Sequence, residues 1–90
     1  MAEKSPTVLL VEHDKQLGQQ LHDALRQKKY QVAWERSADV ALDRFSSDQF
    51  DICVVNDVLP GMSGLDFGKK LRQIDYTTPI LFMSASDDDR

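Results

Sequence analysis

The sequence predicts an α/β fold, a doubly wound parallel sheet with helices on both of its faces. Three short apolar runs predict it, because each is too short for a helix and typical of a strand buried on both faces; they cover residues 7–11, 52–55 and 80–83. Apolar residues at helical spacing occupy the segments between these runs. Strands that alternate with helices in this way indicate βαβ units with right-handed crossovers.

The remaining elements follow in order. Asp14 is expected to cap a helix over residues 15–28, and the partly alternating segment 31–35 predicts an edge strand. Ser37 begins a second helix, and Ser63 begins a third, with Asp66 three residues later as a capping-box-like pair. This third helix would span residues 65–74 and end before Pro79. Its expected apolar face consists of Leu65, Gly68, Leu71 and Ile74.

Composition places the chain among soluble globular domains. Its ninety residues, 41% hydrophobic and 29% charged, suit one small domain. The net charge is −4 and no cluster of Lys and Arg occurs, so direct nucleic-acid binding is not expected. No run reaches membrane-spanning length and no apolar signal segment begins the chain, which predicts a cytoplasmic protein with no membrane contact. The one cysteine, Cys53, is expected to be a buried, reduced thiol.

Polar residues follow each of the three buried runs. Because the carboxyl ends of parallel strands meet at one edge of a sheet, these side chains are expected to lie close together. A turn at Pro60-Gly61 then leads into the third helix. The polar residues at this edge are Glu12, His13, Asn56 and Ser84.

The segment 51–64, DICVVNDVLPGMSG, resembles the receiver domain of two-component response regulators. In that family the third strand ends in a phosphoacceptor Asp, with Pro four residues later and Gly-Met-x-Gly after it. The motif from Pro60 to Gly64, Pro79-Ile80 and Ser84-Ala85 match, so the resemblance covers about residues 7–86. It implies a flavodoxin-like or receiver-like sheet of order 2-1-3-4-5. Residues 1–90 would supply the first four βα units, truncated after the fourth strand, without the fifth strand and the last helices.

The resemblance also implies roles for single residues. Glu12 stands at the first of two acidic metal-binding positions, and His13 stands at the second, where the family keeps its principal acid. Asn56, counted four residues back from the proline, stands at the phosphoacceptor position. Ser84 matches the hydroxyl that binds the phosphoryl oxygens, and the backbone carbonyl of Val58 matches a metal-ligand position. The family's later lysine and switch aromatic have no counterpart.

These residues weaken the chemistry that the family performs. Receiver domains take a phosphoryl group from a histidine kinase onto an Asp carboxylate, while Mg²⁺ neutralises charge on the transferred group. His13 and Asn56 leave one carboxylate of three, and Mg²⁺ prefers oxygen ligands, so the Mg²⁺ site is expected to be weak or empty. An amide oxygen is a poor nucleophile, so Asn56 is not expected to accept phosphate.

We therefore interpret the chain as a degenerate receiver domain of a bacterial response regulator, a non-enzymatic signal-transduction module that acts by protein–protein interaction. A histidine kinase or another signalling protein is the expected partner, and the parent protein is expected to carry an output domain. No cofactor is expected. Because long apolar strand edges pair with other chains, self-association through the fourth strand is also expected.

Other interpretations remain open. An engineered Asp-to-Asn block in a phosphorylatable regulator explains Asn56 but not the independent departure at His13. Asp57 as a substitute acceptor is disfavoured, because successive strand residues point to opposite faces. An FMN-binding flavodoxin-like module needs a phosphate-cradling loop after the first strand, and a haloacid-dehalogenase-type phosphatase needs Asp-x-Asp there. The segment Glu12-His13-Asp14-Lys15 fits neither.

Overall fold

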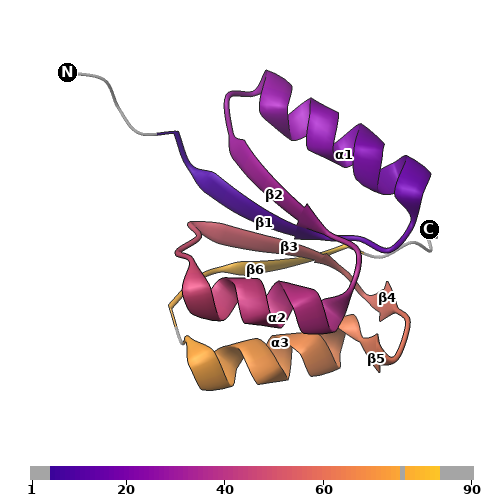
Figure 1. The fold of residues 1–90 in the computed structure, drawn as a ribbon, viewed down its shortest axis with the longest axis vertical. Helices are drawn as coiled ribbons and strands as arrows, with labels where there is room; N and C mark the ends of the chain where they lie inside the picture. The colour runs from indigo at the N-terminus through magenta and orange to yellow at the C-terminus, as the bar shows by residue number, and fades with distance from the viewer. Residues whose placement is uncertain (1–4, 76, 84–90) are drawn as a thin grey trace, which may run out of the picture.

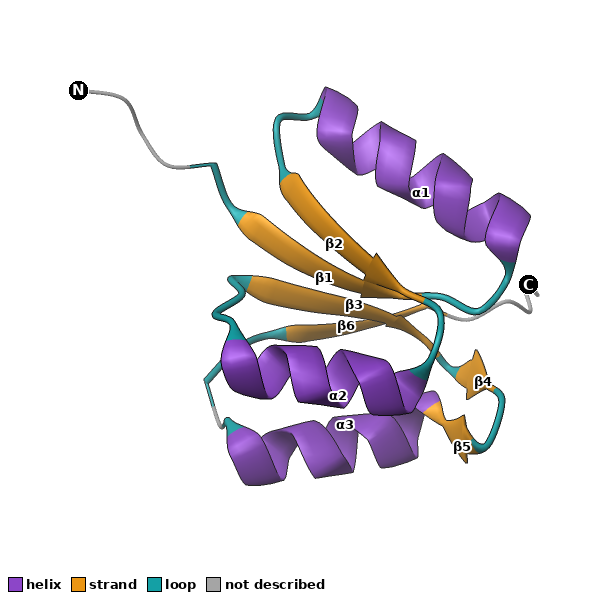
Figure 2. Cartoon of the chain, in the orientation of Figure 1, coloured by secondary structure: helices purple, strands orange, loops and turns teal. Residues whose placement is uncertain are grey.

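The computed structural model describes residues 5–75 and 77–83, which form a sheet between two helical layers (Figures 1 and 2). Helix α1 covers one face of the sheet, and α2 and α3 lie side by side on the other. In chain order the elements are β1 (Thr7–Val11), α1 (Lys15–Gln27), β2 (Gln31–Glu35), α2 (Ala38–Ser47), β3 (Ile52–Asn56), β4 (Val58–Leu59), β5 (Met62–Ser63), α3 (Gly64–Ile74) and β6 (Ile80–Met83).

The sheet has the strand order β2-β1-β3-β6, and every pairing in it is parallel. This confirms the predicted α/β fold, including the place of β2 at an edge. Strands β1 and β3 occupy the centre because each has partners on both sides, and their burial on both faces accounts for their continuous apolar sequences. The matched Ser84-Ala85 pair lies outside the described residues.

The two faces of the central strands have separate cores, divided by the alternation of side chains along each strand. Towards α1, Leu10 and Val54 pack with Leu21 and Leu25 of the helix. Towards α2 and α3, the core cluster comprises Leu9, Val11, Ala38, Ala41, Phe45, Cys53, Val55, Leu59, Phe67 and Leu71. Desolvation at this second core raises the pKa of the Cys53 thiol to about 12, although the charge of Arg72 acts in the opposite direction.

Side-chain caps begin all three described helices, as the sequence predicts. The Asp14 carboxylate accepts a hydrogen bond from the Leu17 amide at 2.9 Å, and the Ser63 hydroxyl accepts one from the Asp66 amide at 3.0 Å. Ser37 accepts from the Val40 amide in the same way. Each such cap stabilises its helix by about 1 kcal/mol.

The expected apolar face of the third helix is wrong at both ends. Leu65 and Ile74 are 60% and 46% exposed, whereas Phe67 and Leu71 are fully buried. The cause is the close approach of the helix start to the end of β3: a Cβ atom at Gly64 would lie 2.6 Å from the Asp57 Cα atom. This contact turns the faces of Gly64 and Phe67 towards the sheet.

A short antiparallel hairpin, β4–β5, follows β3 and was not predicted (Figure 2). The sequence indicates only the turn within it, at Pro60-Gly61, where Gly61 has a φ of +83°. Glycine adopts this left-handed conformation without a steric cost. The hairpin matters for the site because its first residue, Val58, directly follows the polar end of β3.

Helix α1 ends in a Schellman motif that has a lysine at the position where glycine is usual. The Tyr30 amide donates to the Leu25 carbonyl at 3.2 Å, and the Lys29 amide donates to the Arg26 carbonyl at 3.0 Å. Lys29 has a φ of +75°, a left-handed conformation that a Cβ atom makes unfavourable.

We predict that Lys29→Gly stabilises the chain by roughly 0.5–1 kcal/mol, because relief of the left-handed strain exceeds the extra unfolded-state entropy of glycine. The matched control is Lys28→Gly, which removes the same charge at a residue with a φ of −87°. There glycine offers no relief and should cost about 0.5–1 kcal/mol. Urea unfolding of both variants measures the difference, and equal effects would contradict the prediction.

Strand β6 forms the second edge of the described sheet and exposes apolar side chains on both of its faces. Leu81 is 56% exposed and Phe82 is 44% exposed. The ring of Phe82 lies over Gly68 of α3, where an added Cβ atom would be 2.9 Å from it, so Gly68 lets strand and helix approach closely.

We expect the ninety-residue chain to self-associate through β6, because an apolar edge strand with unpaired backbone groups pairs readily with another chain. Leu81→Lys should weaken the association, whereas Val40→Lys, at a residue 48% exposed on α2, should not. Light scattering over a concentration series measures both. A strictly monomeric chain that melts cooperatively above about 55 °C would contradict association through β6.

Candidate functional site

The site lies at the carboxyl edge of the sheet, where β1 and β3 end beside each other. Their parallel register pairs Val11 with Val55, which places Glu12 next to Asn56. The Asn56 Nδ2 atom donates a hydrogen bond to the Glu12 Oε1 atom at 2.7 Å. Both side chains are buried, with exposed fractions of 2% for Glu12 and 5% for Asn56. The two central strands are therefore joined at their ends by a buried carboxylate–amide pair.

The other polar atoms of this pair are also hydrogen-bonded. The Asp14 amide donates to the Glu12 Oε2 atom at 2.9 Å, at the start of α1. The Val58 amide donates to the Asn56 Oδ1 atom at 2.9 Å, at the start of β4. One end of the Asn56 amide thus faces an acceptor and the other faces a donor, which fixes the assignment of its oxygen and nitrogen.

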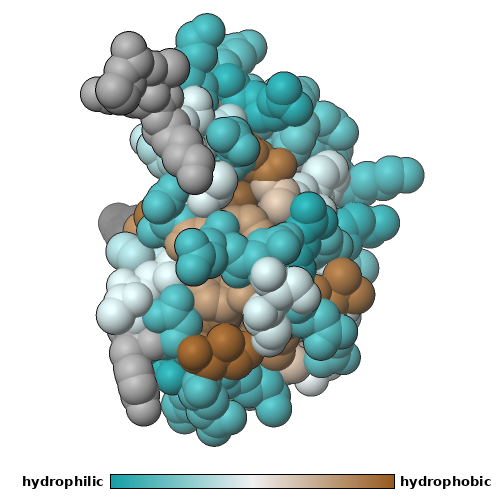
Figure 3. Space-filling model, turned by 60° about the vertical axis from the view of Figure 1, so that its left-hand side comes forward, coloured by the Kyte–Doolittle hydropathy of each residue, from teal (hydrophilic) through white to brown (hydrophobic). Residues whose placement is uncertain are grey.

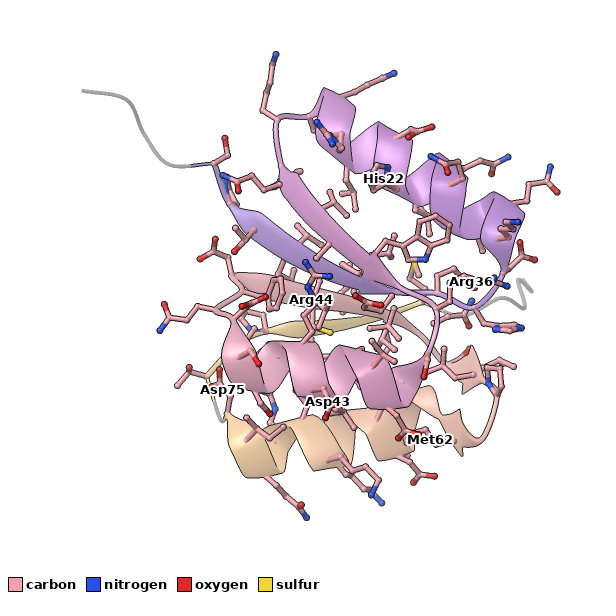
Figure 4. The ribbon with its side chains drawn as sticks, viewed as in Figure 1. His22, Arg36, Asp43, Arg44, Met62 and Asp75 are labelled. Carbon is pink, nitrogen blue, oxygen red and sulfur yellow. The ribbon has the colours of Figure 1, made fainter. Side chains whose placement is uncertain are left out.

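Two side chains from the β2 side hold the main chain of the same loop. The Trp34 indole nitrogen donates to the Glu12 carbonyl at 3.0 Å, and the Arg36 Nε atom donates to the His13 carbonyl at 2.8 Å. Figure 4 shows Arg36 at the carboxyl ends of β1 and β2. Trp34 reaches this position because its ring packs directly against Gly18 of α1, where any larger residue would collide with it.

The structure brings together only some of the residues that the sequence predicts for the site. Glu12 and Asn56 are in direct contact, but His13 is exposed and Asp14 serves as the α1 cap. Val58 is 68% exposed and joins the site through its backbone N–H group. Ser84 lies outside the described residues.

Asp57 is held by its backbone rather than by its side chain. Its amide donates to the Met83 carbonyl at 2.8 Å, and its carbonyl accepts from the Gly64 amide at 2.9 Å. The Oδ1 atom is buried without a hydrogen-bond partner, and no hydrogen bond within the described part of the chain joins this side chain to Glu12 or Asn56. The carboxylate therefore takes no part in the Glu12–Asn56 pair.

The side chains of Glu12 and Asn56, as they are arranged here, do not fit a Mg²⁺ ion, the metal that the family uses. Among residues 5–75 and 77–83, no group of three or more His, Cys, Asp and Glu side chains could hold a metal. Both oxygens of Glu12 already accept hydrogen bonds, and Asn56 turns its NH₂ group, a donor, towards Glu12. Mg²⁺ needs six oxygen ligands in near-ideal octahedral geometry.

Trp34 and Arg36 are parts of the site that sequence reasoning missed. The one sequence signal for Trp34 is its indole N–H group, which needs a hydrogen-bond partner when the ring is buried. Arg36 binds a backbone carbonyl, and no side-chain pattern in the sequence indicates such a contact.

A hollow of about 910 Å³ lies at the opposite, amino edge of the sheet, on the side that Figure 3 brings forward. Its carboxylates already have partners within the chain. Asp51 accepts from the Thr7 amide at 2.7 Å, and Asp75 binds Thr77 and Thr78. The hydrogen bond from Thr78, followed by those from Thr77, lowers the pKa of Asp75 to about 2. The carboxylates of Asp51 and Asp75 are therefore engaged within the chain, and we do not take this hollow as the candidate site.

Comparison with known proteins assigns this chain to a family. Residues 8–90 match the family model of the response regulator receiver domain. The response regulator protein PmrA of Pseudomonas aeruginosa is 35% identical over 80 residues, which cover 89% of this chain and 36% of that protein. The response regulator RppA of Synechocystis is 32% identical, over 87% of this chain and 34% of that protein. The chain thus spans about a third of the length of these relatives.

Solved structures agree with this assignment. The non-phosphorylated HemR receiver domain from Leptospira biflexa superposes with a TM-score of 0.84 and 32% identity, over 94% of this chain and 68% of that one. A putative response regulator from Chloroflexus aurantiacus gives a TM-score of 0.87 and 31% identity, over 94% and 71%. With its sheet order, its polar carboxyl edge and these matches together, the chain belongs to the response regulator receiver domain family of two-component signalling.

Proposed function

We propose that this receiver domain transmits its signal through protein contacts and does not accept a phosphoryl group at position 56. One observation carries the proposal: the residue at the acceptor position is Asn56, whose amide is buried and hydrogen-bonded to Glu12 and to the Val58 amide. The Oδ1 atom is occupied by a donor, and its lone pair belongs to a neutral amide. Both facts make it a poor nucleophile.

The metal side of the chemistry supports the same proposal. Among the described residues of the site Glu12 is the only buried acid, and His13 is exposed at the position of the family's principal acid. Phosphoryl transfer depends mainly on electrostatic stabilisation by a metal and on positioning. Without a set of oxygen ligands, the Glu12, His13 and Val58 positions form at most a weak Mg²⁺ site.

The partners follow from the family and from the surface. Response regulators in general work with histidine kinases and carry output domains, and we propose a kinase or another signalling protein as the partner here. The negative net charge disfavours direct contact of this segment with nucleic acid. Within the described residues no helix is long and apolar enough to cross a membrane. We propose a cytoplasmic location, as for the family.

The alternatives differ in what they require of the β1–α1 loop. An FMN-binding module needs free backbone N–H groups there for a phosphate. In this loop the Asp14 and Leu17 amides are bound by the Glu12 and Asp14 carboxylates, which would also repel an anion. An engineered block at position 56 remains the stronger alternative, and the exposed His13 is the feature that it leaves unexplained.

We predict that acetyl phosphate with Mg²⁺ leaves the mass of the intact chain unchanged, because Asn56 offers no carboxylate. The control is Asp57→Asn, which removes the neighbouring carboxylate and should behave in the same way. A stable gain of one phosphoryl group would refute the proposal. If the gain vanished in Asp57→Asn, the substitute acceptor would be Asp57.

A second prediction concerns the two departures from the family together. Asn56→Asp alone should bind Mg²⁺ only weakly, because His13 still occupies the principal acid position. His13→Asp combined with Asn56→Asp should bind Mg²⁺ far more tightly, since each added carboxylate strengthens attraction to the cation. Trp34 fluorescence can report the titration, because the indole is hydrogen-bonded to the Glu12 carbonyl. Equal affinity of the two variants would exclude His13 from the metal position.

A further inference from the structure

Glu12 presents an electrostatic problem that the family fold does not remove. Its carboxylate is 2% exposed, and among the ion pairs of the described residues none involves Glu12. A buried carboxylate is strongly unfavourable unless donors compensate its charge. In a site built of several carboxylates, a bound cation compensates the negative charge. Here hydrogen-bond donors of the chain itself must compensate the charge of Glu12.

The Asn56 side chain supplies it. Its Nδ2 atom donates to one Glu12 oxygen at 2.7 Å, a short distance typical of a hydrogen bond to a charged acceptor. The Asp14 amide donates to the other oxygen at 2.9 Å. Replacing the Asn56 nitrogen by a carboxylate oxygen would set two like charges at the same separation, which is unfavourable unless a cation or a proton lies between them.

The pair also connects four elements of the carboxyl edge. Through Glu12 it joins the end of β1 to the start of α1, and through Asn56 it joins the end of β3 to the start of β4. The main chain of Glu12 is held in addition by the Trp34 indole and by a bond from its own amide to the Glu35 carbonyl at 3.1 Å. Each side-chain oxygen and nitrogen atom of the Glu12–Asn56 pair therefore has a hydrogen-bond partner within the chain.

We infer that the Asn56 amide takes the place of a divalent cation as the partner of Glu12, and so holds the carboxyl edge of the sheet in one conformation with or without metal. This inference rests on the proposed function and deepens it, because a site that needs no cation presents a constant surface to a partner protein. Asn56 is a positioning residue in this arrangement. Asn56 then has two effects: it removes the carboxylate that accepts the phosphoryl group, and it fixes the conformation of the carboxyl edge of the sheet.

The test exchanges the two functional groups. Asn56→Asp places two carboxylates in contact, and it should lower the folding equilibrium constant in EDTA by roughly 10- to 100-fold, the range for losing a hydrogen bond to a charged group. The double variant Glu12→Gln with Asn56→Asp restores one amide and one carboxylate in reversed places. The new glutamine can accept from the Asp14 amide and donate to the new carboxylate, which still accepts from the Val58 amide. This variant should recover most of the lost stability.

Unfolding of the ninety-residue chain and both variants is measured in EDTA and in millimolar Mg²⁺. The original chain should be equally stable in both solutions, and the NMR signals of the Trp34 indole and the Asp14 and Val58 amides should not shift. Mg²⁺ should stabilise Asn56→Asp slightly, in keeping with a weak site, and should not stabilise the exchanged pair. If Asn56→Asp fails to fold even with Mg²⁺, the exchanged pair alone decides.

Three results would overturn the inference: Mg²⁺ stabilising the original chain, Asn56→Asp retaining full stability in EDTA, or the exchanged pair failing to regain stability. None of them bears on phosphoryl acceptance, which the mass measurement with acetyl phosphate tests separately. If the unfolding measurements contradict this inference, the proposed function can still stand. If the mass measurement contradicts the proposed function, the stability effect of Asn56 can still be judged by itself.

Discussion

The parallel pairing of β1 with β3, buried on both faces, is the constraint on which the rest of this structure depends. Because helices cover both faces, the interior of these strands is apolar, from Val8 to Val11 and from Ile52 to Val55. Polar groups can first occur at the carboxyl edge, where Glu12 and Asn56 still remain buried. Since a buried polar group needs a partner and the register sets these two side by side, each satisfies the other.

Because position 56 lies directly beside the buried Glu12 carboxylate, the side-chain group at this position strongly affects the charge and the hydrogen bonding of the site. An Asp and an Asn differ by one oxygen replaced by one NH₂ group, and they occupy almost the same volume. At position 56 the change turns an acceptor into a donor and removes one negative charge from a site of low dielectric. In this structure the hydrogen bonds of Asn56, to Glu12 and from the Val58 amide, lie wholly within the chain.

The sequence predicted the elements well because their signals are local. Apolar runs, helical spacing and the caps at Asp14, Ser37 and Ser63 each depend on a few neighbouring residues. The failures depend on distant contacts. Which face α3 buries is decided by the meeting of Gly64 with the end of β3, and the role of Trp34 by its fit against Gly18. Glu12 and Asn56 could be assigned to one edge, but the direction of their hydrogen bond and the exposure of His13 required three-dimensional positions.

Cys53 adds a chemical property to the centre of this fold. The thiolate is the form that oxidants and disulfides attack, and burial at the α2–α3 core raises the pKa of this thiol to about 12. Almost none of it is ionised at neutral pH, and the side chain is fully buried between the sheet and helices α2 and α3. Any oxidation of Cys53 therefore requires α2 or α3 to move away from the sheet first. The domain's resistance to oxidative damage at this residue has two sources, the un-ionised state of the thiol and the helices that cover it.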